Sequence, residues 1–125
     1  MLRVADLDAA MRFYRDALGM RLLRQHDYHD ARFTRAFLGY GSEQSEAALE
    51  LTHNWDKSTY TQGDAYGHIA IEVIDAADSC NRALALGYQV TRKAGPMKHG
   101  RTVIAFIQDP DGYKIELIQK ADQYD

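Results

Sequence analysis

The sequence predicts an α+β fold built from two tandem βαβββ modules. The first observation is an internal repeat: Asp6 opens one helical pattern and Asp75 opens another, while the strand-like segment around Phe37 recurs around Phe106, in both cases 69 positions later. The second observation is that each copy has one helical pattern, preceded by one strand-like run and followed by three. Halves of about 60 residues are marginal alone. Each half is therefore expected to pack against the other or against a second chain.

The first module is expected to begin with a strand at residues 2–4, followed by an amphipathic helix. Apolar side chains of this helix recur at i, i+4, i+7 and i+11, namely Leu7, Met11, Tyr14 and Leu18. Asp6 or Asp8 is available as the N-cap, and Gly19 is placed to end the helix. Three strand-like runs then follow, at residues 20–23, 32–39 and 47–52.

The second module repeats this order. A strand is expected at residues 68–73, and then a helix capped by Asp75 and ended by Gly87, with Ala77, Cys80 and Leu84 along one face. Its last three strands are expected at residues 88–92, 102–108 and 114–119. The first module thus covers residues 1–56, a polar linker covers 57–64, and the second module covers 65–125.

Composition excludes several classes of function. The 15 basic residues are interspersed with 18 acidic ones and the net charge is −3, which argues against nucleic acid as a partner. The lone cysteine, Cys80, can form no disulfide within the chain and is expected to be a small core residue. No apolar run is long enough for a signal peptide or a membrane span. We therefore expect a cytoplasmic protein that does not enter a membrane.

A glutamate occupies the same place in the final strand of each module. Glu50 lies between two leucines, and Glu116 lies between Ile115 and Leu117, so each carboxylate points away from its apolar neighbours. One such glutamate alone is more often simply solvent-facing. The matching placement in both copies, together with His68 at the start of the second module, favours a site for a divalent first-row metal ion.

The repeat also predicts where a further ligand would lie. His68 precedes Val73 by five positions, and Val73 corresponds to Val4 because each stands two residues before its capping aspartate. The equivalent of His68 would therefore stand two residues before Met1. If the site follows the internal symmetry, a fourth protein ligand is expected just upstream of this sequence.

Several segments carry a resemblance to a known family over almost the whole chain. They are residues 1–4, 13–14, 18–20, 49–55, 65–70 and 105–116, which include Leu-Thr-His-Asn-Trp, Tyr-Gly-His and Asp-Pro-Asp-Gly-Tyr. In this combination and spacing the chain resembles glyoxalase I, the lactoylglutathione lyase of the vicinal oxygen chelate superfamily. The resemblance implies a homodimer in which paired modules form open mixed-sheet barrels and the metal lies between two subunits.

The resemblance also implies the metal ligands. Glu50, His68 and Glu116 match ligand positions of the family, and the family's remaining ligand, a His or Gln, stands two residues before Met1. Either the chain begins at an internal methionine of the native protein, or three protein ligands and water suffice. The resemblance to compact bacterial members favours nickel, with cobalt or zinc as alternatives.

The activity implied is isomerisation of the methylglyoxal–glutathione hemithioacetal to S-lactoylglutathione, which detoxifies methylglyoxal. Glu116 is expected to be the principal base, and Glu50 to serve the opposite substrate stereochemistry. The family positions expected to bind substrate are Arg3, Asn54, His68 and Arg92. The chain departs from some relatives at Asp64, where they carry an arginine, and Lys98 is placed to compensate.

Two rival functions stay open at this stage. The same fold serves metal-free proteins that sequester a small molecule, and a missing first ligand would favour such a binding module. An extradiol dioxygenase generally uses two histidines and one carboxylate, the reverse of the set seen here.

The remaining histidines and three aromatic residues carry less weight. His26 and His29 are expected in a surface loop, and His53 is expected to support the binding segment next to Asn54. Three aromatic residues are candidates for the pocket wall or for the core, namely Trp55, Tyr66 and Phe106.

Overall fold

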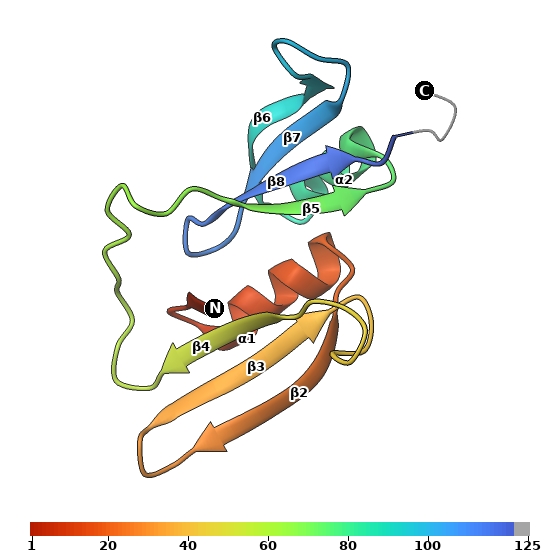
Figure 1. Ribbon diagram of the computed structural model, residues 1–125. Coiled ribbons are helices and arrows are strands. Elements are labelled where there is room, and N and C mark those ends of the chain that lie inside the picture. Colours follow the sequence, from red (N-terminus) through yellow and green to blue (C-terminus); the bar gives the residue numbers. More distant parts are fainter. Residues whose placement is uncertain (122–125) are drawn as a thin grey trace. The chain divides into compact units, whose positions relative to one another are not determined.

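The structure is a computed structural model that describes residues 1–121. The chain divides into two compact units, the first comprising residues 1–63 and the second beginning at Asp64. Each unit consists of one four-stranded mixed sheet and the helical segment that follows its first strand (Figure 1). No helix within these described residues is long and apolar enough to cross a bilayer.

The first unit has its strands in the order β1-β4-β3-β2. Strand β1 runs parallel to β4, and the other neighbours are antiparallel. The elements along the chain are β1 (Leu2–Arg3), α1 (Leu7–Arg12), the π-helical turn η1 (Phe13–Ala17), β2 (Arg21–Tyr28), β3 (Phe33–Gly39) and β4 (Leu49–Asn54).

The second unit repeats this topology, with its strands in the order β5-β8-β7-β6 and β5 parallel to β8. Its elements are β5 (Ile69–Val73), α2 (Ala76–Ala85), β6 (Gln89–Pro96), β7 (Val103–Gln108) and β8 (Lys114–Gln119). The predicted pair of βαβββ modules is therefore confirmed.

Strand register confirms the repeat residue by residue. Phe37 of β3 lies opposite Glu50 of β4, and Phe106 of β7 lies opposite Glu116 of β8. The parallel strand on the other side repeats as well, because Leu2 is paired with Leu51 and Ile71, 69 positions after Leu2, is paired with Leu117, 66 positions after Leu51. The two glutamates thus occupy equivalent positions in their sheets.

Aspartate caps begin both helices, as the sequence predicts. Asp6 accepts a hydrogen bond from the amide of Ala9, and Asp75 accepts one from the amide of Asp78, each at 3.0 Å. Each cap leaves an otherwise unpaired N-terminal amide satisfied. Of the two candidates in the first unit, Asp6 rather than Asp8 is the cap.

The end of the first helix differs from the expected regular helix. Residues Phe13–Ala17 form a π-helical turn, and within it the adjacent Phe13 and Tyr14 are both fully buried, with ring centroids 4.8 Å apart in edge-to-face contact. Regular helical spacing predicts only Tyr14 on the apolar face, and the wider turn accompanies burial of both rings. Gly19 and Gly87 then end the two helical segments with φ of 74° and 90°.

Strand β2 corrects one expectation. The strand was expected to end at residue 23, but it continues to Tyr28, so His26 lies in a strand and not in a surface loop. The cause is the position of β2 at the edge of its sheet, where polar side chains are tolerated because one side of the strand borders solvent. His29 does lie in the turn that follows.

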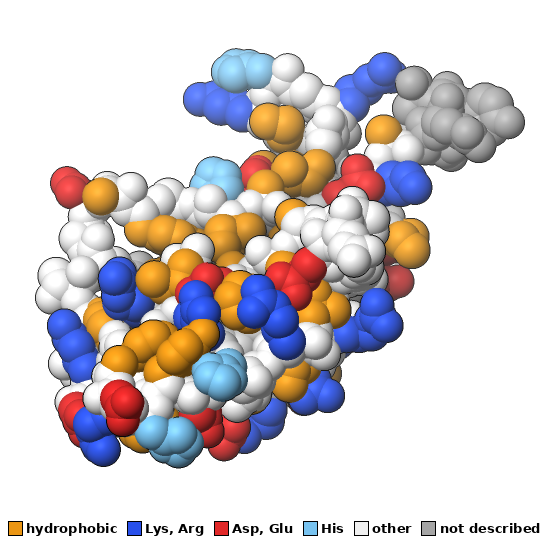
Figure 2. Space-filling model, turned by 60° about the horizontal axis from the view of Figure 1, so that its bottom comes forward, with side chains coloured by type: hydrophobic (Ala, Val, Ile, Leu, Met, Phe, Trp, Pro, Cys, Tyr) orange, Lys and Arg blue, Asp and Glu red, His pale blue; other side chains and the backbone are white. Residues whose placement is uncertain are grey.

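Each core lies on the face of the sheet that its helix covers. Side chains there are fully or nearly fully buried, among them Leu38, Leu51, Ile107, Ile115 and Leu117, and Cys80 of α2 is buried as expected. Alternation then sends the intervening residues to the opposite face of each sheet. On the face shown in Figure 2, acidic and basic side chains are interspersed.

Candidate functional site

The second unit brings His68 and Glu116 into direct contact. Glu116 is paired with Ala70 of β5, and His68 stands two residues before Ala70, so strand alternation puts both side chains on one face of the sheet. The His68 Nε2 atom lies 3.2 Å from the Glu116 Oε1 atom. Phe106 packs edge-on against the imidazole at 5.3 Å between ring centroids. Two strands and one aromatic ring therefore fix this pair.

Exposure differs between the two side chains of this pair. His68 is 44% exposed, whereas Glu116 is 14% exposed. The imidazole is therefore accessible to solvent, while the carboxylate lies mostly within the sheet surface. Such an arrangement presents one nitrogen and one oxygen donor to a small molecule or ion.

The donor atoms fit a shared metal ion. First-row ions hold nitrogen and oxygen ligands at about 2.0–2.2 Å, so neighbouring donors around one ion are about 3 Å apart. The His68–Glu116 separation of 3.2 Å matches this spacing. Within residues 1–121, however, no group of three potential ligand side chains is clustered. The structure thus brings together two of the three predicted ligands.

Glu50 occupies the equivalent position in the first unit. Its Oε2 atom accepts a hydrogen bond from Thr52 Oγ1 at 3.0 Å, which orients the half-buried carboxylate. Phe37 lies opposite it, as Phe106 lies opposite Glu116. That Glu50 joins His68 and Glu116 in one ligand set stays a prediction.

Two of the residues expected to bind substrate lie on the first sheet. Asn54, at the end of β4, donates a hydrogen bond to the hydroxyl of Tyr60 at 3.0 Å. Arg3 of β1 is paired in register with Thr52, which places it on the same face as Glu50. Both roles in binding stay predictions.

Arg92 has a structural environment that the sequence did not reveal. Its Nη1 atom donates to the carbonyl oxygens of Lys93, Gly95 and Ile104 at 2.9–3.3 Å, and its Nη2 atom donates to that of Pro96 at 3.0 Å. The guanidinium therefore holds together the irregular β6–β7 hairpin. A ligand carboxylate at Arg92 would have to share donors that already bind the backbone.

The aromatic candidates have distinct roles. Trp55 donates its indole N–H to Thr34 at 2.9 Å, and Tyr66 donates its hydroxyl to the Lys114 carbonyl at 2.9 Å. Burial raises the pKa of Tyr66 to about 12, which keeps this phenol protonated. Phe106 contacts a predicted site residue, His68.

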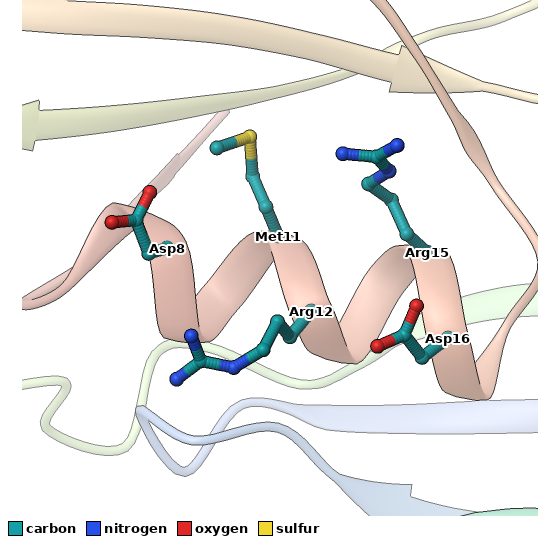
Figure 3. A pocket seen from close by; sticks show the side chains of 5 residues that line it. All are labelled: Asp8, Met11, Arg12, Arg15 and Asp16. Atoms are coloured by element: carbon teal, nitrogen blue, oxygen red, sulfur yellow. The ribbon is translucent and has the colours of Figure 1, made fainter.

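Two surface hollows among the described residues are lined by side chains other than the predicted ligands. One lies on α1 and η1, lined by exposed charged side chains and Met11, none of which is a predicted site residue (Figure 3). A second, of about 340 Å³, lies over β2 and β3 and is lined by Arg24, Gln25, His26, Tyr28 and Phe37. Of these lining residues, Phe37 is the one that lies opposite Glu50 in the pairing of β3 with β4.

Comparison with protein families decides the assignment of the fold. A family model described as the Glyoxalase/Bleomycin resistance protein/Dioxygenase superfamily matches residues 1–117. The chain belongs to this superfamily. The resemblance inferred from the sequence motifs is confirmed.

Individual members of the superfamily are similar over nearly the whole chain. The lactoylglutathione lyase of Neisseria meningitidis is 60% identical over 96% of this chain and 87% of its own length. The probable lactoylglutathione lyase of Synechocystis is 54% identical over 100% of this chain and 95% of its own.

Solved structures of the superfamily agree with this fold. Glyoxalase I from Zea mays matches with a TM-score of 0.93 at 46% identity, over 97% of this chain and 43% of the maize chain. This chain thus spans less than half the length of the maize protein. The trypanothione-dependent glyoxalase I of Leishmania major matches with a TM-score of 0.84 at 39% identity, over 95% of this chain and 83% of that one.

Proposed function

We propose that this chain is a lactoylglutathione lyase that isomerises the methylglyoxal–glutathione hemithioacetal to S-lactoylglutathione. The structural observation that carries the proposal is the His68–Glu116 pair, in which His68, directly before β5, and Glu116 of β8 lie 3.2 Å apart on one face of a sheet. The 60% identity to a lactoylglutathione lyase of nearly the same length supports it.

The reaction requires removal of a proton from a carbon next to a carbonyl group. Glu116 is the principal base in this proposal, because its carboxylate is mostly buried and is oriented by the contact with His68. The proton returns to the adjacent carbon, so the reaction involves no net oxidation. Glu50 takes the corresponding role for the opposite stereochemistry, as its equivalent register position suggests.

A divalent metal completes the proposed site. Glu50, His68 and Glu116 would hold it, with nickel favoured and cobalt or zinc as alternatives. When bound, such an ion supplies Lewis-acid stabilisation of the negative charge that develops on substrate oxygen. Arg3, Asn54 and Arg92 are proposed to bind the glutathione moiety, with His68 also bordering the substrate.

Assembly and location follow from the same proposal. The chain forms a homodimer whose sites lie at the subunit interface, which is the arrangement that the resemblance implies. A cytoplasmic location is supported by the lone, buried Cys80, because a chain that forms no disulfide suits a reducing compartment.

The main alternative is a metal-free protein that binds and sequesters a small molecule. The observation that favours it is that residues 1–121 contain no cluster of three potential ligand side chains. The contact of an imidazole with a carboxylate at ligand spacing weighs against it.

Isomerase activity on the methylglyoxal–glutathione hemithioacetal distinguishes the two functions. Protein stripped of metal would be supplied separately with nickel, cobalt or zinc, and thioester formation would be followed by ultraviolet absorbance. We expect turnover with nickel and no turnover without metal. A folded protein that binds S-substituted glutathione but stays inactive with all three metals would contradict the proposal and support the binding module.

A further inference from the structure

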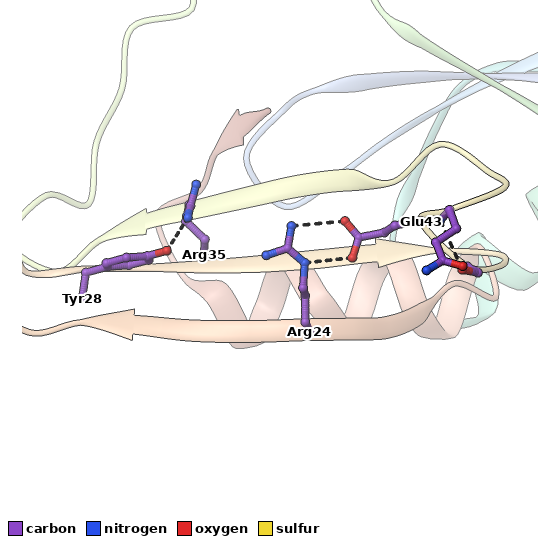
Figure 4. Close-up of polar contacts among 6 residues, drawn as sticks. Arg24, Tyr28, Arg35 and Glu43 are labelled. Atoms are coloured by element: carbon purple, nitrogen blue, oxygen red, sulfur yellow. Dashed lines mark hydrogen bonds and ion pairs between the residues drawn. The ribbon is translucent and has the colours of Figure 1, made fainter.

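Arg35 of β3 has a side chain that the proposed reaction does not use. Its Nε atom is fully shielded from solvent and has no hydrogen-bond partner among residues 1–121. Buried donors in native proteins are nearly always satisfied, and an unsatisfied one therefore asks for an explanation. Its Nη2 atom donates to the hydroxyl of Tyr28 (Figure 4).

The guanidinium group of Arg35 lies close to two aromatic rings. Its guanidinium carbon lies 4.9 Å from the ring centroid of Tyr28 and 5.7 Å from that of Phe37. Both rings line the hollow over β2 and β3. Within the described part of the chain Arg35 forms no ion pair with a carboxylate, whereas Arg24 of the neighbouring strand β2 is paired with Glu43 at 2.8 Å (Figure 4).

Register puts Arg35 on the same sheet face as Glu50. Phe37 is opposite Glu50, and Arg35 is opposite Thr52, so Arg35 and Glu50 are diagonal neighbours across β3 and β4. Diagonal neighbours on one face are about 7–8 Å apart at the backbone, within reach of long side chains. A group bound at Arg35 would therefore lie on the substrate side of the sheet, a short distance beyond Glu50.

We propose that Arg35 is a specificity-determining residue that lets the enzyme accept 2-oxoaldehydes whose side chain carries a carboxylate. This rests on the proposed function. In that proposal Glu50 faces the reacting carbons of the substrate. Arg35, its diagonal neighbour on the adjacent strand, would then lie next to the side chain of the aldehyde. The planar guanidinium can engage a carboxylate in bidentate fashion, and the flanking rings suit an aryl or alkyl spacer.

The chemistry needs no additional reactant. The hemithioacetal R–CO–CH(OH)–SG loses the proton on the carbon that bears sulfur, the neighbouring carbonyl carbon gains a proton, and the hydroxyl proton passes to the former carbonyl oxygen, which gives R–CH(OH)–CO–SG. The R group, with its carboxylate, is unchanged. Arg35 touches only this group, so it contributes to binding and not to the proton transfer.

Two glutathione hemithioacetals form a matched pair of probes, those of phenylglyoxal and 4-carboxyphenylglyoxal. The ratio of their kcat/KM values would be measured for the wild type, Arg35→Met and Arg35→Lys. We expect the ratio to fall about tenfold in the methionine variant and less in the lysine variant, as for loss of a charge-assisted hydrogen bond. Circular dichroism and thermal melting would establish that each variant is folded.

Arg32→Met is the matched control, because it removes a cation that stands in the turn before β3, outside the hollow, and is already paired with Asp56. We expect its ratio to stay within about twofold of the wild type, as is usual for an exposed ion pair. An unchanged ratio in folded Arg35→Met, or an equal fall in Arg32→Met, would overturn the proposal. An equal rise of KM for both substrates would also overturn it, because Arg35 would then bind glutathione itself.

Binding measurements separate this proposal from the proposed activity. Calorimetry would compare the affinities of S-(4-carboxybenzyl)glutathione and S-benzylglutathione for the wild type, Arg35→Met and Arg35→Lys. A preference for the carboxylated ligand that disappears in Arg35→Met would support the role of Arg35 even in a protein without isomerase activity. No preference in the wild type would overturn the role of Arg35 and leave the lyase activity unaffected.

Discussion

At the residue scale, the most informative contact is that between His68 and Glu116. The placement of both residues could be predicted from the sequence, because strand alternation and the repeat depend only on spacing. The four carbonyl contacts of Arg92 and the shielded Nε atom of Arg35 could not. Those features depend on side-chain conformations and on irregular strand pairing, which periodicity does not encode.

Replacing Glu116 by glutamine tests its role as the base. The variant keeps the shape of the side chain but removes the carboxylate, so we expect kcat to fall by at least about a hundredfold, the range of general-base contributions. Binding of S-benzylglutathione, measured by calorimetry, should change little. Glu72→Gln is the control, because this exposed glutamate of β5 is neither a predicted metal ligand nor a predicted substrate-binding residue. Near-normal turnover in Glu116→Gln would remove Glu116 from the role.

At the scale of elements, the turn between β7 and β8 sets the register that places Glu116. Buried Asp109 accepts hydrogen bonds through Oδ1 from the amides of Asp111 and Tyr113, each at 2.9 Å. The Asp-Pro-Asp-Gly-Tyr segment, one of the motifs of the family resemblance, forms this turn, and Gly112 adopts a φ of 88°. Strand β2 was harder to predict, because its polar edge has no alternating apolar pattern.

We expect Asp109→Ala to lower the free energy of unfolding by about 2–4 kcal/mol, because two amides lose a charged acceptor. Asp109→Asn retains one oxygen acceptor and should cost less. Urea denaturation followed by circular dichroism would measure both variants. Equal stability of the alanine variant and the wild type would show that the turn forms without this side chain.

At the scale of the whole molecule, the predicted ligands are divided between the two units. Glu50 belongs to the first unit, and His68 and Glu116 belong to the second. The sequence predicted this division through its repeat. It could not define the assembly, because the packing of one unit or chain on another depends on surfaces that a repeat does not specify.

Complementation tests the proposed interface site. If each site takes Glu50 from one subunit and Glu116 from the other, a heterodimer of Glu50→Gln and Glu116→Gln chains contains one intact site and one doubly altered site. Chains co-expressed with two different tags and purified through both should then recover roughly half of the wild-type activity. Either variant alone, purified in the same way, is the control. No recovery in a verified heterodimer would place all ligands of a site on one chain.

The burial of Cys80 affects how readily methylglyoxal could modify the protein. Methylglyoxal attacks thiolates, and an enzyme that consumes this electrophile works where it is present. Cys80 is the chain's single thiol, and burial raises its pKa, so it is both inaccessible and protonated at neutral pH. In the proposed reaction glutathione thus supplies the sulfur nucleophile, while the protein presents no reactive thiol of its own to be consumed.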